Sequence, residues 1–147
     1  MTPYLEVDEA QDYFDTRLNS SAWDDASDTN KYKSLCTATR LINNLDYIGE
    51  KAYLDQDNEF PRLGQLDTPD DIKEACCEIA VQLLDGYDPD YEIASIGDIQ
   101  AHYSSVRSLY NRDFAMDYIR AGIPSAQAWQ RLTKYLNNPS KVIIRRV

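Results

Sequence analysis

The chain has 147 residues, of which 43% are hydrophobic, 11% aromatic and 27% charged. This length suits one domain with one hydrophobic core, and the apolar share argues against intrinsic disorder. The first residues lack the basic and apolar regions of a signal peptide, and no stretch reaches the roughly 18 apolar residues of a membrane span. We therefore expect a folded protein with no membrane partner.

Charge is distributed unevenly along the chain. The net charge is −10, but residues 1–100 carry 7 Lys or Arg and 23 Asp or Glu, whereas residues 101–147 carry 8 and 2. This asymmetry predicts that the basic end meets an acidic partner or the acidic body of a neighbouring copy. The alternative is that the charges only solvate two surfaces.

Two helices are predicted in the first 45 residues, from apolar residues spaced three and four positions apart. The first opens at Asp8, which has capping-box spacing to Gln11, and ends near Leu18. Its expected apolar face comprises Ala10, Tyr13, Phe14 and Leu18. The second begins at Asp28 or Thr29, after a polar loop that Trp23 is expected to fix to the core. Its expected buried face comprises Tyr32, Leu35, Cys36, Thr39, Ile42 and Leu45.

Residues 46–67 lose the helical period, and Gly49, Pro61 and Gly64 interrupt regular structure. We predict an ordered loop here. Its expected anchors to the core are Tyr47, Ile48, Tyr53, Leu54 and Phe60. The candidates for contacts between subunits or for holding the loop are Tyr47, Tyr53, Phe60 and Arg62.

A third helix is predicted to open at Thr68, as N-cap, with Pro69 at the first helical position. Gly86 supplies its stop. Cys77 lies about 100° round this helix from Cys76, so only Cys76 is expected to face the core squarely. The predicted buried face comprises Ile72, Ala75, Cys76, Ile79, Ala80, Leu83 and Leu84.

The last third of the chain predicts an extended segment at about 87–111, a short helix at 112–121 and a final helix capped by Ser125. Residues 138–147 form a tail whose β-branched residues are framed by positive charge, and such a segment needs a partner strand. The predicted fold class is mainly α. We expect a small helical bundle over residues 1–137, with an extended or β arm and a C-terminal extended tail.

Residues that could carry catalysis or hold a cofactor are few. The single histidine, His102, has no Cys or His at metal spacing, and no glycine-rich phosphate loop is present. The acidic clusters at 24–25, 55–59 and 67–71 could bind calcium or carry acid/base chemistry. The cluster at 55–59 lacks the glycine and the distant Glu of a calcium loop, so a solvated loop is the favoured interpretation. We expect no enzyme activity, no cofactor and no metal.

The three cysteines are odd in number and include an adjacent pair, which indicates free thiols in a reducing compartment. Cys36 and Cys76 lie in apolar stripes, so packing is expected rather than nucleophilic chemistry. Single-stranded DNA binding is the second hypothesis for function, because basic surfaces with tyrosines can stack bases. The residues available for it are Arg107, Arg112, Arg120, Arg131, Lys134, Lys141, Arg145 and Arg146.

The order of several motifs carries a family resemblance. Tyr4-Leu-Glu-Val-Asp-Glu-Ala is followed by Tyr13-Phe14 and Trp23, then by Ala38-Thr39-Arg40-Leu41-Ile42, Tyr47-Ile48-Gly49-Glu50-Lys51 and Phe60-Pro61-Arg62. Pro69-Asp-Asp-Ile-Lys then opens a helix, and a weaker echo follows at 129–136. Over about residues 4–105 the chain resembles the head-completion or head-to-tail adaptor family of tailed bacteriophages, part of which is labelled DnaT-like single-stranded DNA-binding protein. The loop is more acidic than usual in that family, and residues 111–123 look like an added helix.

The resemblance implies a structural virion protein, made in the host cytoplasm and located in the neck. Its implied partners are the portal protein, a tail or nozzle/stopper protein and further copies in a ring of about twelve subunits, through which genomic DNA passes without specific binding. The expected portal-binding residues are in the tail, where an extended basic segment can be captured by strand addition or charge pairing. They are Lys141, Val142, Ile143, Ile144, Arg145, Arg146 and Val147.

Overall fold

A computed structural model describes residues 2–87 and 118–137. Within these ranges the chain is mainly helical, as predicted, and its only β pairing consists of the isolated antiparallel bridges Tyr47–Leu136 and Lys51–Arg62. The predicted arm at 87–111, most of the helix at 112–121, His102 and the tail lie outside the described residues. The named elements are α1 (Val7–Phe14), α2 (Ser21–Asp24), α3 (Asp28–Asn43), α4 (Asp70–Leu84), α8 (Ala126–Leu132) and the 3₁₀ helix η1 (Thr133–Tyr135).

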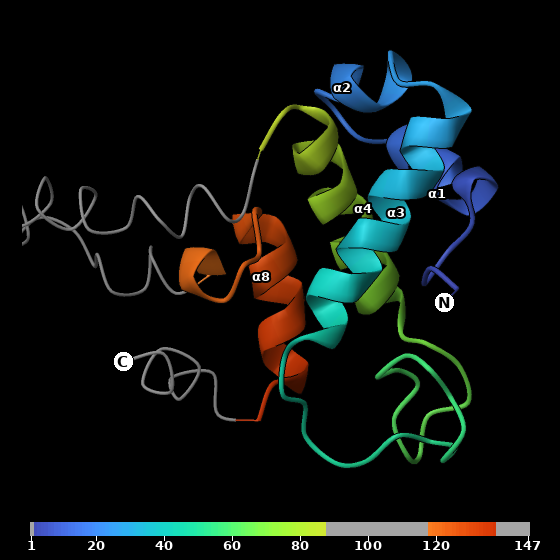
Figure 1. Ribbon diagram of the computed structural model, residues 1–147, viewed down its shortest axis with the longest axis vertical. Helices are drawn as coiled ribbons and strands as arrows, with labels where there is room; N and C mark the ends of the chain where they lie inside the picture. The colour runs from blue at the N-terminus through green and yellow to red at the C-terminus, as the bar shows by residue number, and fades with distance from the viewer. Residues whose placement is uncertain (1, 88–117, 138–147) are drawn as a thin grey trace, which may run out of the picture.

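Helix α4 lies at the centre of the bundle. It packs against α3 on one side and α8 on another, and α1 and α2 contact it as well. The loop that joins α3 to α4 closes one end of the bundle, at the bottom of Figure 1, close to the end of α8. In the ranges 2–87 and 118–137, no helix combines the length and the apolarity needed to cross a bilayer.

The core forms where the apolar stripes of these helices meet. Five of the seven residues predicted for the face of α4 are buried, and Leu83 and Leu84 are half-buried. Cys77 is also fully buried, contrary to expectation, because α4 is covered on more than one side. Trp23 lies in α2, a short helix where a polar loop was predicted. It fixes this segment to the core as predicted, since it is fully buried and stacks on Phe14 at 4.5 Å between ring centroids.

The ends of the helices follow local capping chemistry. Ser125 accepts a hydrogen bond from the amide of Ala128 at 3.1 Å, as predicted for the N-cap of α8. Ser27, which was not predicted as a cap, accepts one from Asn30 at 3.2 Å and is the N-cap of α3. The cap of α1 was predicted wrongly: Glu6, not Asp8, forms the capping box. The cap of α4 is Pro69, one residue beyond the predicted Thr68.

Two residues predicted on apolar faces are exposed. Leu18 is 85% exposed because α1 ends at Phe14, four residues earlier than predicted, so the helical period no longer applies to it. Tyr32 is also exposed, near the start of α3. A tyrosine can pack part of its ring and leave its hydroxyl in water.

Candidate interaction site

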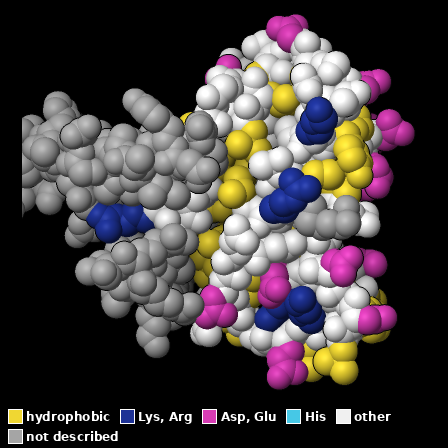
Figure 2. Space-filling view, in the orientation of Figure 1, with side chains coloured by type: hydrophobic (Ala, Val, Ile, Leu, Met, Phe, Trp, Pro, Cys, Tyr) yellow, Lys and Arg dark blue, Asp and Glu magenta, His cyan; other side chains and the backbone are white. Residues whose placement is uncertain are grey.

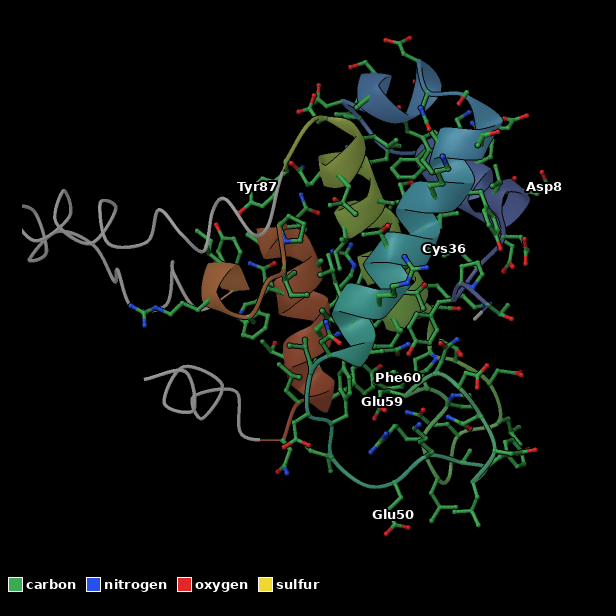
Figure 3. All side chains as sticks on the ribbon, in the orientation of Figure 1. Asp8, Cys36, Glu50, Glu59, Phe60 and Tyr87 are labelled. Carbon is green, nitrogen blue, oxygen red and sulfur yellow. The ribbon has the colours of Figure 1, made fainter. Side chains whose placement is uncertain are left out.

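Phe60 holds the long loop, residues 46–67, against the bundle (Figure 3). Its ring lies edge-on to three tyrosines, with centroid distances of 4.6 Å to Tyr47, 5.5 Å to Tyr135 and 6.3 Å to Tyr4. The hydroxyl of Tyr47 donates to the carbonyl of Ile42 at 2.6 Å. Burial raises the pKa of Tyr47 and of Tyr4, so both hydroxyls remain protonated at neutral pH.

Arg62 organises the backbone of the loop from inside. The residue is 8% exposed, and its Nε donates to the carbonyl of Ile48 at 3.2 Å. Nη2 donates to the carbonyls of Tyr47, at 3.4 Å, and of Gly49. Nη1 donates to both the carbonyl and the carboxylate of Glu59, each at 3.0 Å. One guanidinium thus satisfies three successive carbonyls on one side of the loop and Glu59 on the other.

The loop is also joined to the end of the described chain. The amide of Ile48 donates to the carbonyl of Tyr135 at 2.9 Å. The amide of Asn137 donates to the carbonyl of Asp46, also at 2.9 Å. These bonds pair the two segments antiparallel, so the start of the loop and the residues after α8 fix each other.

Five large apolar side chains of this fixed loop are exposed. Ile48, Tyr53 and Leu54 were expected to hold the loop to the core, and that expectation is wrong: Tyr53 is 64% exposed and Leu54 fully exposed. The loop has no regular period from which their direction could be read, and Phe60 and Arg62 hold it instead. Exposed apolar side chains on one segment are typical of an interaction surface. We call this set the apolar loop residues: Ile48, Tyr53, Leu54, Leu63 and Leu66.

Carboxylates accompany the apolar loop residues. Glu50, Asp55, Asp57 and Asp67 are exposed, and none forms an ion pair within the part of the chain that the structure describes. Glu50 points away from the body at the lower end of the molecule (Figure 3), where Figure 2 shows acidic and hydrophobic side chains next to one another. The loop therefore offers an apolar surface with negative charge around it.

A buried ion pair joins the segment after α1 to the middle of α4. Glu78 is 1% exposed, and its carboxylate accepts from Nε of Arg17 at 2.7 Å and from Nη2 at 2.9 Å. Tyr13 donates its hydroxyl to the same carboxylate. Burial opposes ionisation of Glu78, but the hydrogen bonds from Arg17 and Tyr13 outweigh it and lower the pKa of the carboxyl.

Sequence reasoning missed this pair, although one signal was present. Glu78 is a lone carboxylate within the apolar run from Ala75 to Val81, where an unpaired charge would be costly. Its environment therefore required a cationic partner from another element. Glu78 holds α1 on α4, because its carboxylate accepts from Tyr13 in α1 and from Arg17 just after it.

The cysteines are free and buried. Burial raises the pKa of Cys76 to about 12, and it also raises that of Cys77. Cys76 lies 3.6 Å from the hydroxyl of Thr39 inside the core. Thiols so placed are protonated at neutral pH and contribute packing.

No group of three or more potential metal ligands occurs among the residues that the structure describes. In the acidic cluster at 55–59, Glu59 is occupied by Arg62 at 3.0 Å and Lys51 at 3.6 Å. A shallow depression between α1 and α4 contains Glu9 and Lys73, which pair at 3.2 Å. Its other lining residues are Leu5, Tyr13, Asp70, Glu74 and Cys77.

The basic residues considered for DNA binding are partly neutralised. Arg131 pairs with Glu74 at 3.2 Å and Lys134 with Asp71 at 3.1 Å, so α4 supplies a carboxylate to each. Arg120 is half-buried. The remaining candidates, Arg107, Arg112, Lys141, Arg145 and Arg146, lie outside the described residues.

Two further cations, both outside the basic C-terminal third, lie on α3. Lys33 and Arg40 are exposed on α3 and form no ion pair in the ranges 2–87 and 118–137. They lie seven residues apart, two turns along the same helix face. Lys31 lies 5.2 Å from the ring centroid of Trp23 and is engaged there.

The fold and the loop together define a small, mainly helical protein with a fixed, solvent-facing segment at one end of the bundle. The chain belongs to a family described as "Putative DnaT-like ssDNA binding protein", whose model matches residues 2–141. No curated protein and no solved structure matches the chain. The family description mentions DNA and carries no information about a phage neck.

Proposed function

We propose that this protein is a head-to-tail adaptor of a tailed bacteriophage, a structural subunit that forms a ring between the portal and the tail. The observation that supports the proposal is the loop at 46–67, whose backbone is fixed from inside while five large apolar side chains face solvent. A fixed apolar surface binds another protein at little cost in conformational entropy, because the loop is ordered beforehand.

The acidic body fits the same role. Most of the protein's 25 Asp and Glu residues occur in residues 1–100, and Figure 2 shows acidic side chains at many points of the visible face. Such a surface repels phosphate, so a ring with acidic residues at its lumen would let DNA pass without capturing it.

A depletion experiment tests the adaptor proposal. Phage that lacks this chain should produce DNA-containing heads and tails that do not join, because the portal and tail lose the protein between them. Supplying the wild-type chain from a plasmid should restore joined particles. Normal yields of infectious particles without the chain would rule the adaptor role out.

Single-stranded DNA binding is the second candidate, favoured by the family description and by the two unpaired cations on α3. Filter binding at low salt separates the two functions. Tight binding that weakens steeply with salt, and that is lost in a Lys33→Glu, Arg40→Glu variant, would favour DNA binding. A Lys31→Glu variant is the control, because Lys31 is engaged with Trp23.

A further inference from the structure

We propose that the loop at 46–67 of one copy binds the C-terminal segment 138–147 of a second copy, so that copies join head to tail. The inference rests on the proposed function, since a closed ring of identical subunits needs one contact repeated between neighbours. The loop at 46–67 and the segment 138–147 would make that contact, so the tail would bind a neighbouring subunit instead of the portal.

The loop supplies the receiving surface. The apolar loop residues are exposed between 59% and 104%, and four exposed carboxylates lie among them in sequence. Lys51 and Arg62, the loop's cations, are both paired with Glu59. A partner must therefore bring apolar side chains together with positive charge.

The C-terminal segment has this composition. Its last seven residues, Lys141-Val-Ile-Ile-Arg-Arg-Val147, contain three cations and four β-branched apolar residues, and no Asp or Glu occurs from residue 138 to 147. Apolar contact with the loop's leucines would supply affinity, and pairing with the four carboxylates would set specificity and register.

The pairing at the end of the described chain favours a second copy over the same copy. Asn137 is bonded to Asp46, and Tyr135 to Ile48, so the chain runs toward the end of α3 as it leaves residue 137. Residues 49–66 lie in the opposite direction along that pairing. A tail that continued its direction would move away from its own loop, whereas the tail of a neighbour can approach without reversing.

Sedimentation velocity on the isolated full-length protein tests the proposal. We expect the wild type to form concentration-dependent oligomers. A loop variant, Asp55→Lys, Asp57→Lys and Asp67→Lys, and a tail variant, Lys141→Glu, Arg145→Glu and Arg146→Glu, should each associate at least about tenfold more weakly, since three exposed charge pairs become repulsive.

Mixing the two variants gives the sharper result. The basic tail of the loop variant can bind the native loop of the tail variant, and the reversed segments attract each other too. The mixture, and a single chain carrying both sets of changes, should therefore regain association. A control variant, Asp12→Lys, Asp24→Lys and Asp25→Lys, changes the same charge on exposed residues away from the loop and should associate like the wild type.

A separate variant tests the contribution of the apolar loop residues. Leu54→Asn with Leu66→Asn should weaken association without changing stability, because both side chains are exposed, whereas Leu18→Asn, also exposed but outside the loop, should have no effect. A monomeric wild type, or variants that associate normally, would overturn the proposal. If the tail variant lost only co-assembly with the portal, the tail would belong to the portal. The measurement uses no phage, so its failure is distinct from failure of the adaptor role.

Discussion

Replacing Arg62 should loosen the loop at 46–67 and lower the free energy of unfolding of the whole protein. In Arg62→Lys the charge is kept, but one ammonium cannot reach the carbonyls of Tyr47, Ile48 and Gly49 that the guanidinium serves together. Leaving about two carbonyls without a partner at a partly accessible site costs about 2–3 kcal/mol. With a urea slope of about 2 kcal/mol/M, the unfolding midpoint should fall by about 1–1.5 M.

Urea unfolding followed by circular dichroism measures this shift, and the slope should not change. Lys51→Met is the matched control, because Lys51 contacts the same Glu59 at 3.6 Å while 35% exposed, so its loss should cost less than about 1 kcal/mol. Amide exchange should also accelerate at Ile48 and Leu63, whose amides are bonded at the base of the loop. If Arg62→Lys kept the wild-type midpoint and exchange rates, the guanidinium would not organise the loop.

Three further predictions follow from the same structure. Glu78→Gln should lower stability at pH 7 by about 2 kcal/mol, since it breaks a buried, hydrogen-bonded pair. The pKa of Glu78 is lowered in the folded state, so its carboxylate stabilises the fold above the ordinary Glu pKa of about 4.3. This stabilisation is lost as pH falls through the folded pKa, so the free energy of unfolding should depend less on acid pH in the variant. Cys76 and Cys77 should react with a thiol reagent only in denaturant; rapid labelling of the native protein would contradict their burial. Deleting residues 139–147 should abolish self-association of the isolated protein, because the segment that binds the loop is removed, and undiminished association would exclude the tail from the contact between copies.

The helical core could be predicted because its signals are local. The apolar residues of α3 and α4 recur every three or four positions, and Ser125 stands where an N-cap of α8 is favoured. The errors at the starts of α1 and α4 are shifts of one or two residues. Several adjacent residues there, such as Glu6 and Asp8, can each serve as a cap.

The candidate site could be predicted only in part. The presence of an ordered loop between α3 and α4, and the burial of Phe60 and Tyr47, follow from aromatic residues among turn residues. The outward direction of the Tyr53 and Leu54 side chains could not be predicted, because an irregular backbone has no period. Arg62 binds carbonyls 13 to 15 positions away, and the pair between Arg17 and Glu78 spans 61, so these contacts leave no local pattern.

An image reconstruction of the neck of the phage particle is the decisive experiment for assembly through the loop at 46–67. We expect a ring of this protein between portal and tail, with Leu54 and Leu66 covered by a neighbouring subunit. A neck without this chain, or a ring in which those leucines face open solvent, would exclude this mode of assembly.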